Sequence, residues 1–196
     1  MKKILIMLLA AALLALGGAD PLAAQSGGQT GEKAMNLKDK KILLVYFSHS
    51  GNTAALAKQI QAVTGGEMFE VTTVTPYPEE YRATTEAARR ELDEGARPAL
   101  KNAGPDLDGY EVIFIGYPNW WGTLPMALFT FLEGRDLAGK TVVPFTTHEG
   151  SRFGRSLDDL TRLTPGATLV QGFEIRGSRA ANAGSALTDW LGSLGF

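Results

Sequence analysis

The chain has 196 residues, of which 44% are hydrophobic and 20% charged, and this composition excludes collagen, coiled coils and wholesale disorder. Its 19 Lys and Arg residues against 21 Asp and Glu residues give a formal charge of -2, which offers no basic surface for nucleic acid. The sequence has no cysteine and two histidines. It therefore provides no disulfide, no thiol catalysis and no expected metal site.

The first 24 residues have the pattern of a secretory signal peptide. Lys2 and Lys3 precede an uncharged apolar run over residues 4–16, and small residues follow. The run is shorter than the roughly 18 residues that a membrane helix needs. We therefore expect residues 1–24 to be removed during export to the periplasm or the cell exterior, leaving no stable membrane span. An uncleaved segment would instead anchor the chain in the membrane.

The remaining chain divides into a leader and one domain. Residues 25–39 are rich in Gly, Ser, Gln and Lys, and we expect them to form a flexible leader. Residues 40–196 are expected to form the folded domain. Without residues 1–24 the chain keeps 17 basic and 20 acidic residues, a charge of -3.

Five short apolar runs predict β-strands, because they are rich in β-branched and aromatic residues and are bounded by Gly, Pro or polar residues. They span residues 42–47, 68–74, 112–116, 141–145 and 168–175. Continuous apolar strands separated by helical patterns indicate a parallel sheet covered on both faces, hence a doubly wound α/β domain. Pro144 lies inside the fourth run and has no N–H, so we expect that strand to end early or bulge there.

Apolar residues at helical spacing predict the helices between these strands. They are Leu56, Ile60 and Val63; Leu124, Leu128 and Leu132; Leu157, Leu160 and Leu163; and Leu187, Trp190, Leu191 and Leu194. Residues 79–94 predict a more polar helix, because Ala, Glu and Arg predominate there. Its acidic residues Glu91, Asp93 and Glu94 are interpreted as a solvated face rather than a metal site.

The first loop of interest follows Phe47 and runs from Ser48 to Thr53. Ligands of doubly wound sheets bind beyond the carboxyl ends of the strands. Hydroxyl and amide residues with a glycine at a helix N-terminus suit an anion such as phosphate. The alternative is an ordinary N-cap, in which Asn52 or Ser50 bonds the first helical turn. The loop alone does not decide between them.

Two further loops follow strands. The second, residues 116–125, carries the adjacent Trp120 and Trp121. A planar aromatic ligand could stack on one indole, or both could anchor the loop on the following helix. In the third loop, residues 146–156, His148 and Glu149 could be a general acid–base pair or a solvated turn. We prefer the turn, because no nucleophile accompanies them.

Together the three loops resemble those of flavodoxins, in particular flavodoxin-like proteins with a Trp-Trp-Gly loop. The resemblance covers residues 40–196 and implies the short-chain type, with a five-stranded sheet of order 2-1-3-4-5 in a three-layer sandwich and noncovalently bound FMN. It implies phosphate contacts from Ser48, Ser50, Gly51, Asn52 and Thr53; ring contacts from Pro118, Asn119, Trp120, Trp121 and Gly122; and contacts to the other ring edge from Thr147, Glu149, Gly150 and Ser151.

The resemblance leaves three functions open. In the two that transfer electrons, the flavin rather than a protein side chain carries the chemistry. An FMN-dependent oxidoreductase would pass electrons from NAD(P)H to a quinone-like acceptor. A single-electron carrier would connect redox protein partners, and an exported binding module would be non-catalytic. We favour the oxidoreductase, because the mild charge weakens docking to protein partners. Arg152, where similar proteins are expected to have glycine, should favour two-electron chemistry by its positive charge.

Overall fold

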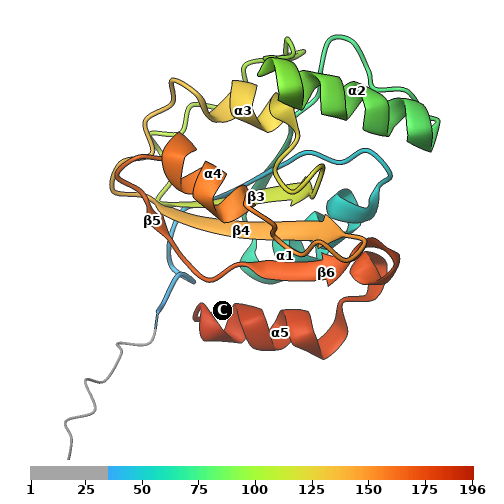
Figure 1. The fold of residues 1–196 in the computed structure, drawn as a ribbon. Helices are drawn as coiled ribbons and strands as arrows, with labels where there is room; N and C mark the ends of the chain where they lie inside the picture. Colours follow the sequence, from blue (N-terminus) through green and yellow to red (C-terminus); the bar gives the residue numbers. More distant parts are fainter. Residues whose placement is uncertain (1–34) are drawn as a thin grey trace, which may run out of the picture. The chain divides into compact units, whose positions relative to one another are not determined.

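The computed structural model describes residues 35–196, which form a sheet with helices on both faces (Figure 1). The predicted signal peptide and residues 25–34 of the predicted leader lie outside the described residues. Leu37, which the prediction placed in the leader, is buried, and its N–H donates to the Leu194 carbonyl at 3.1 Å. The folded unit therefore begins before Lys40. Within residues 35–196, no helix combines the length and the apolar character that a membrane crossing requires.

The central sheet is parallel throughout. Its strands are β1 (Ile42–Tyr46), β2 (Glu67–Glu70), β3 (Val112–Pro118), β4 (Thr141–His148), β5 (Thr168–Leu169) and β6 (Phe173–Arg176). The spatial order is β2-β1-β3-β4, and both β5 and β6 pair with β4, one after the other along its outer edge. The predicted order 2-1-3-4-5 is confirmed, with the predicted fifth strand present as two pieces.

Pro144 leaves β4 unbroken and interrupts its neighbour instead. The Val142 carbonyl accepts the Val170 N–H at 3.0 Å, so the backbone polar groups of even-numbered residues in β4 point toward β5 and β6. Pro144 is also even-numbered, and its missing N–H would lie on that same side. Between the paired positions, two residues of β4 oppose the three residues 170–172. The prediction that the fourth strand ends or bulges was wrong; the irregularity lies in the fifth.

Helices cover both faces of the sheet (Figure 1). On one face lie α1 (Asn52–Thr64), α5 (Gly184–Ser193) and the short 3-10 helix η1 (Gly177–Asn182), and on the other lie α2 (Tyr81–Glu94), α3 (Met126–Leu132) and α4 (Ser156–Leu163). Alternate residues of β1 enter the two cores, Leu44 toward α1 and Leu43 toward α3. Val63, predicted as part of the apolar stripe of α1, is 54% exposed.

Candidate ligand-binding site

The first loop ends in an open helix N-terminus. Gly51 is the N-cap of α1, with a φ of 87° and no side-chain cap bond. The Ala54 N–H donates instead to Ser48 Oγ at 3.1 Å. The alternative of a cap from Asn52 or Ser50 is therefore wrong, and the first amides of α1 have no partner inside the helix. Together with the helix dipole, these amides form a site that suits an anion.

The first loop is joined to the third by two buried threonines. Thr53 Oγ1 lies 2.9 Å from Thr147 Oγ1, and both side chains are buried. The hydroxyl of Thr53 therefore connects two loops. Its predicted contact with a phosphate stays a prediction, and its position beneath the loop makes the backbone N–H the group that is free to make it.

The second loop turns sharply at its two tryptophans. The Trp120 N–H donates to the Thr123 carbonyl at 2.9 Å, and the Thr123 N–H donates back at 3.1 Å. Between them Trp121 and Gly122 have φ values of 54° and 83°, the positive pair of a type I′ turn. Glycine adopts this conformation freely, whereas a residue with a Cβ pays about 1–2 kcal/mol. Trp121 is therefore held in a strained backbone conformation.

Trp120 turns toward the sheet and joins an aromatic cluster. Its half-buried ring is edge-on to Phe47 at 5.3 Å, to Tyr77 at 5.0 Å and to His49 at 5.9 Å between ring centroids. Edge-to-face geometry is favourable for aromatic pairs. The cluster thus connects the first and second loops through side-chain packing.

Trp121 turns the other way and contacts α2. Its Nε1–H donates to the Thr85 carbonyl at 2.9 Å, and the Arg89 guanidinium lies 5.2 Å from its ring. The ring nevertheless stays 48% exposed. Its anchor is α2 rather than the following helix, so the structural alternative considered for both tryptophans is wrong for Trp121.

Backbone and amide groups join the second loop to the third. The Asn119 N–H donates to the Thr147 carbonyl at 2.8 Å, and Asn119 Nδ2 donates to the Arg152 carbonyl at 2.7 Å. Asn119 Oδ1 in turn accepts the Gly122 N–H at 2.9 Å. The Arg155 N–H donates to the Gly122 carbonyl at 2.8 Å. All three loops therefore meet around Thr147 and Asn119.

The third loop is held by a buried histidine and by β6. His148 is only 8% exposed, its Nδ1 accepts the Gly150 N–H at 2.9 Å, and its Nε2 is paired with Glu174. The interpretation as a solvated turn is thus wrong for His148, although Glu149 is exposed. Arg152 has a φ of 51° and lies 3.4 Å from Glu174. Within residues 35–196, Trp121 and Arg152 alone among non-glycine residues have positive φ, and both lie in these loops, where strain often accompanies function.

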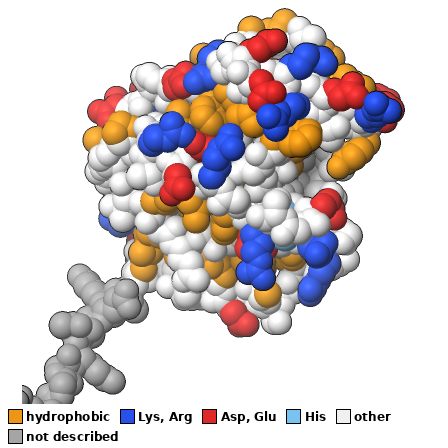
Figure 2. Space-filling model, viewed as in Figure 1, with side chains coloured by type: hydrophobic (Ala, Val, Ile, Leu, Met, Phe, Trp, Pro, Cys, Tyr) orange, Lys and Arg blue, Asp and Glu red, His pale blue; other side chains and the backbone are white. Residues whose placement is uncertain are grey.

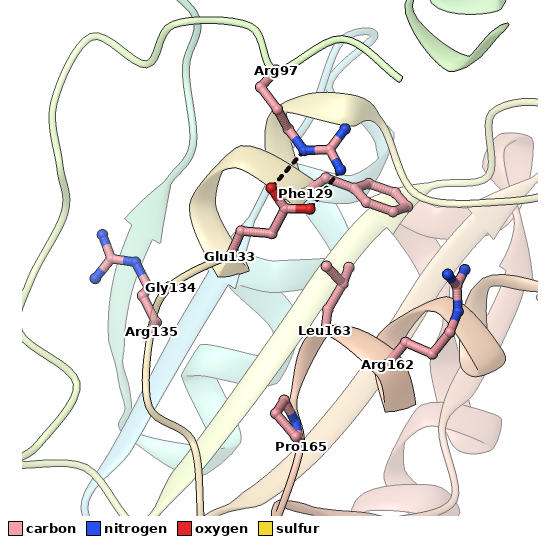
Figure 3. A pocket seen from close by; sticks show the side chains of 8 residues that line it. All are labelled: Arg97, Phe129, Glu133, Gly134, Arg135, Arg162, Leu163 and Pro165. Carbon is pink, nitrogen blue, oxygen red and sulfur yellow. Dashed lines mark hydrogen bonds and ion pairs between the residues drawn. The ribbon is translucent and has the colours of Figure 1, made fainter. Parts of the chain in front are cut away.

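A hollow of about 430 Å³ lies away from these loops, at the C-terminal ends of α3 and α4 (Figure 3). Arg97 lies over the Phe129 ring at 5.3 Å and forms an ion pair with Glu133 at 2.5 Å. Arg162 is paired with Asp159. The charged groups that line this hollow thus have partners already, whereas the first loop presents unpaired helix amides. We therefore place the candidate site at the loops.

Sequence reasoning missed two residues that shape the site, Tyr77 and Glu174. The Tyr77 hydroxyl donates to Glu91 at 2.6 Å, and burial together with this contact raises the pKa of Tyr77. Burial also raises the pKa of the Glu91 carboxyl. The prolines on both sides of Tyr77 were the available signal for an ordered loop. For Glu174 it was the alternation of apolar and charged residues over 173–176, which is typical of an edge strand.

Comparison with known proteins gives consistent matches. The sequence profile of the flavodoxin family matches residues 41–194. A structure assigned as a flavoprotein, from Bacteroides eggerthii, is 32% identical over 81% of this chain and 99% of its own, with a TM-score of 0.68. Its counterpart from Bacteroides uniformis is 29% identical over 78% and 97%, also at 0.68. A flavoprotein in complex with FMN, from Lactobacillus acidophilus, is 23% identical over 71% and 95%, at 0.60. Comparison with curated proteins gives no match.

Proposed function

The chain belongs to the flavodoxin family, and from this premise we propose that it binds FMN at the three loops and acts as an FMN-dependent oxidoreductase. Bound FMN would supply the hydride and electron chemistry, while the protein supplies position and electrostatics. The convergence of the three loops around Thr147 and Asn119 carries the proposal. Three polar loops held together at the carboxyl edge form the usual ligand position of this sheet type.

The first loop fits a phosphate group. The 13-residue helix α1 directs its free N-terminal amides and the positive end of its dipole at this loop. Ser48 Oγ accepts the Ala54 N–H, so its hydroxyl proton stays available for a further acceptor. Ser50 and Gly51 are exposed and Asn52 is half-buried. A dianionic phosphate would thus receive several donors and meet no carboxylate of this loop.

The second and third loops fit a planar ring. The second loop supplies two large aromatic surfaces that point in opposite directions, and either Trp120 or Trp121 can stack on the ring. Glu149, Gly150 and Ser151 are exposed on the other loop. Gly150 has a φ of 141°, which L side chains rarely adopt, so the backbone conformation requires glycine there.

Surface charge supports a small-molecule donor and acceptor, for which we propose NAD(P)H and a quinone-like molecule. On the face drawn in Figure 2, basic and acidic side chains are interspersed with apolar atoms rather than gathered by sign. Docking to a redox protein relies on a one-signed face that steers the encounter. A diffusing small molecule needs only access to the ring.

The proposal is tested with purified protein titrated with FMN. We expect a perturbed visible spectrum and quenched tryptophan emission on binding. With NADH or NADPH under anaerobic conditions, we expect bound FMN to be reduced faster than free FMN, and a quinone to restore the oxidised spectrum. Failure to bind FMN would refute the cofactor. Binding followed by reduction only with a chemical reductant would refute the oxidoreductase and favour an electron carrier.

We also propose that the protein is exported, on the basis of the pattern in residues 1–24 alone. Expression of the full chain in a bacterial host, followed by cell fractionation and mass spectrometry, tests this. The expected product is exported protein that lacks the signal segment. Intact Met1 on protein in the cytoplasmic fraction would contradict it.

A further inference from the structure

His148 is the last residue of β4 and lies at the base of the third loop. Both of its ring nitrogens have partners: Nδ1 accepts the Gly150 N–H at 2.9 Å, and Nε2 contacts Glu174. A nitrogen that accepts a backbone N–H carries no proton of its own. The neutral imidazole therefore has its proton on Nε2, which donates it to the Glu174 carboxylate.

The loop that follows His148 is held from β6 at two more points. Glu174 Oε1 lies 3.4 Å from the Arg152 guanidinium, and the Arg176 guanidinium donates to the Glu149 carbonyl at 2.9 Å. In sequence, these two contacts lie on either side of Gly150, whose N–H bonds the imidazole. The loop conformation thus depends on the bond from Gly150 to His148 and on the two contacts from β6.

We propose that His148 is a positioning residue for the third loop, and that its neutral form is required for tight binding of FMN, an inference that rests on the proposed function. In the neutral form the imidazole fixes the Gly150 N–H and, with it, the exposed backbone of Glu149 and Ser151. Protonation places an N–H at Nδ1 directly against the Gly150 N–H. Two donors then face each other, so the bond is replaced by repulsion.

The sign of the effect follows from these contacts. The imidazolium keeps its partner at Nε2, because Glu174 is an acceptor whichever form the ring takes. The loss falls on Gly150, which is exposed and free to change conformation as a glycine. The loop therefore leaves the binding conformation as the pH falls, and affinity for FMN decreases. By linkage, bound FMN favours the neutral imidazole to the same extent.

The charged groups around His148 come from two elements. β6 supplies Glu174 and Arg176, and the third loop supplies Glu149 and Arg152. These four charges balance in sign. On the β3 side Pro118 and Asn119 lie beside the preceding residue, Thr147, and on the α1 side Asn52 lies beside Gly177 and Glu149. Histidine is the side-chain type that changes its charge between pH 5 and 8, so the test spans that range.

The test compares FMN affinity from pH 8 to pH 5, by calorimetry, in the unmodified protein and in His148→Asn. Asparagine can still accept the Gly150 N–H through Oδ1, but it does not titrate. We expect the unmodified protein to lose about five- to tenfold more affinity than the variant, the loss of one hydrogen bond. The FMN phosphate also titrates near pH 6, but it does so in both proteins and cancels in their ratio. Equal pH profiles would overturn the proposal.

The chain offers a matched control in His49→Asn, because His49 is the only other histidine of the sequence. His49 lies in the first loop and contacts Thr84 Oγ1 at 3.2 Å. Whatever this substitution does to affinity at pH 8, the fall toward pH 5 is expected to match that of the unmodified protein. A fall that disappears with His49 and persists in His148→Asn would refute the assignment.

A second measurement needs no cofactor and no substitution. Nitrogen NMR of the imidazoles in the FMN-free protein should show Nε2 protonated and Nδ1 bare at pH 8. The Gly150 amide resonance should move with the same pH midpoint as the His148 ring. A Gly150 amide that ignores the titration, or a proton on Nδ1 at pH 8, would refute the inference. If the protein binds no FMN at any pH, the proposed function fails while this experiment still tests the loop.

Discussion

The first and third loops meet at the same edge of the sheet, yet they are held in different ways. The first takes its shape from nearby residues: Gly51 turns the chain, and Ser48 bonds an amide six residues along. The third takes its shape from β6, because Glu174 and Arg176 reach back to it across more than 20 residues. The turn at the phosphate end of the site is thus set by local contacts, with Thr53 joining it to the third loop, whereas the ring edge depends on contacts from β6.

The largest expected effect is on FMN affinity, and it tests the phosphate contacts of the first loop. If the first loop holds a phosphate, FMN should bind far more tightly than riboflavin, which lacks it. Two charge-assisted hydrogen bonds at about 1.5 kcal/mol each amount to about 3 kcal/mol, a difference of roughly 100-fold in affinity. Parallel calorimetric titrations measure it. Equal affinities would remove the phosphate role from Ser48, Ser50, Asn52 and Thr53. The first loop would then not be the phosphate end of the site.

The second loop sharpens the comparison, because its two tryptophans face different neighbours. Trp120→Ala removes three edge-to-face contacts and should lower the free energy of unfolding by about 2–3 kcal/mol. Trp121→Ala removes one hydrogen bond and one exposed cation–π contact, at a cost of about 1 kcal/mol. Urea unfolding without FMN gives both values.

The same two variants show which indole stacks on the flavin. Loss of the stacking ring should weaken FMN binding by about 1–3 kcal/mol and remove most of the tryptophan quenching. If both variants bind FMN as the unmodified protein does, the tryptophans are structural anchors. Equal unfolding energies for the two would contradict the different environments assigned to them.

The connection between the two loops is tested by a double-mutant cycle. Thr53→Val leaves the buried Thr147 hydroxyl without its partner, and Thr147→Val does the converse. Each should lower the free energy of unfolding by about 1–2 kcal/mol, and the double variant should cost about 1 kcal/mol less than their sum. Ser50→Val, at an exposed position, is a matched control with little expected effect. Additive costs would mean that the loops are held independently.

The local nature of the first loop also explains how much the sequence could predict. Apolar runs and helical spacing predict the strands and the helices, because these patterns are properties of neighbouring residues. The strand order followed from the resemblance to flavodoxins. The loops follow from the strands, since ligand loops come after strand ends. The two-piece fifth strand was missed, because it depends on which neighbour Pro144 faces. The strand that Pro144 faces is decided by strand register, which the sequence of a single segment does not determine.

The same limit applies within the site. His148 resembled a turn residue because the sequence places polar residues on both sides of it, while its partner Glu174 lies 26 residues away. The opposite directions of Trp120 and Trp121 depend on the position of α2 and on two positive φ angles. Neither follows from the Trp-Trp-Gly pattern. Contacts between distant segments were thus the part of the site that pattern arguments could not provide.

The smallest expected effect is on the redox potential, and it concerns Arg152 in the third loop. A bare unit charge about 6 Å from the ring would contribute about 3 kcal/mol at an effective dielectric of 20. The side chain is 77% exposed and paired with Glu174, so water and the opposite charge should reduce this below about 1 kcal/mol. Arg152→Gly should therefore lower the two-electron potential by no more than about 20 mV. It should leave stability nearly unchanged, because relief of the positive φ offsets the lost ion pair.

Arg152→Lys, which keeps the charge, should hold the potential, and anaerobic redox titration compares the three proteins. A raised potential in Arg152→Gly would contradict the attraction between this charge and the reduced cofactor, and would leave the third loop only its positional role.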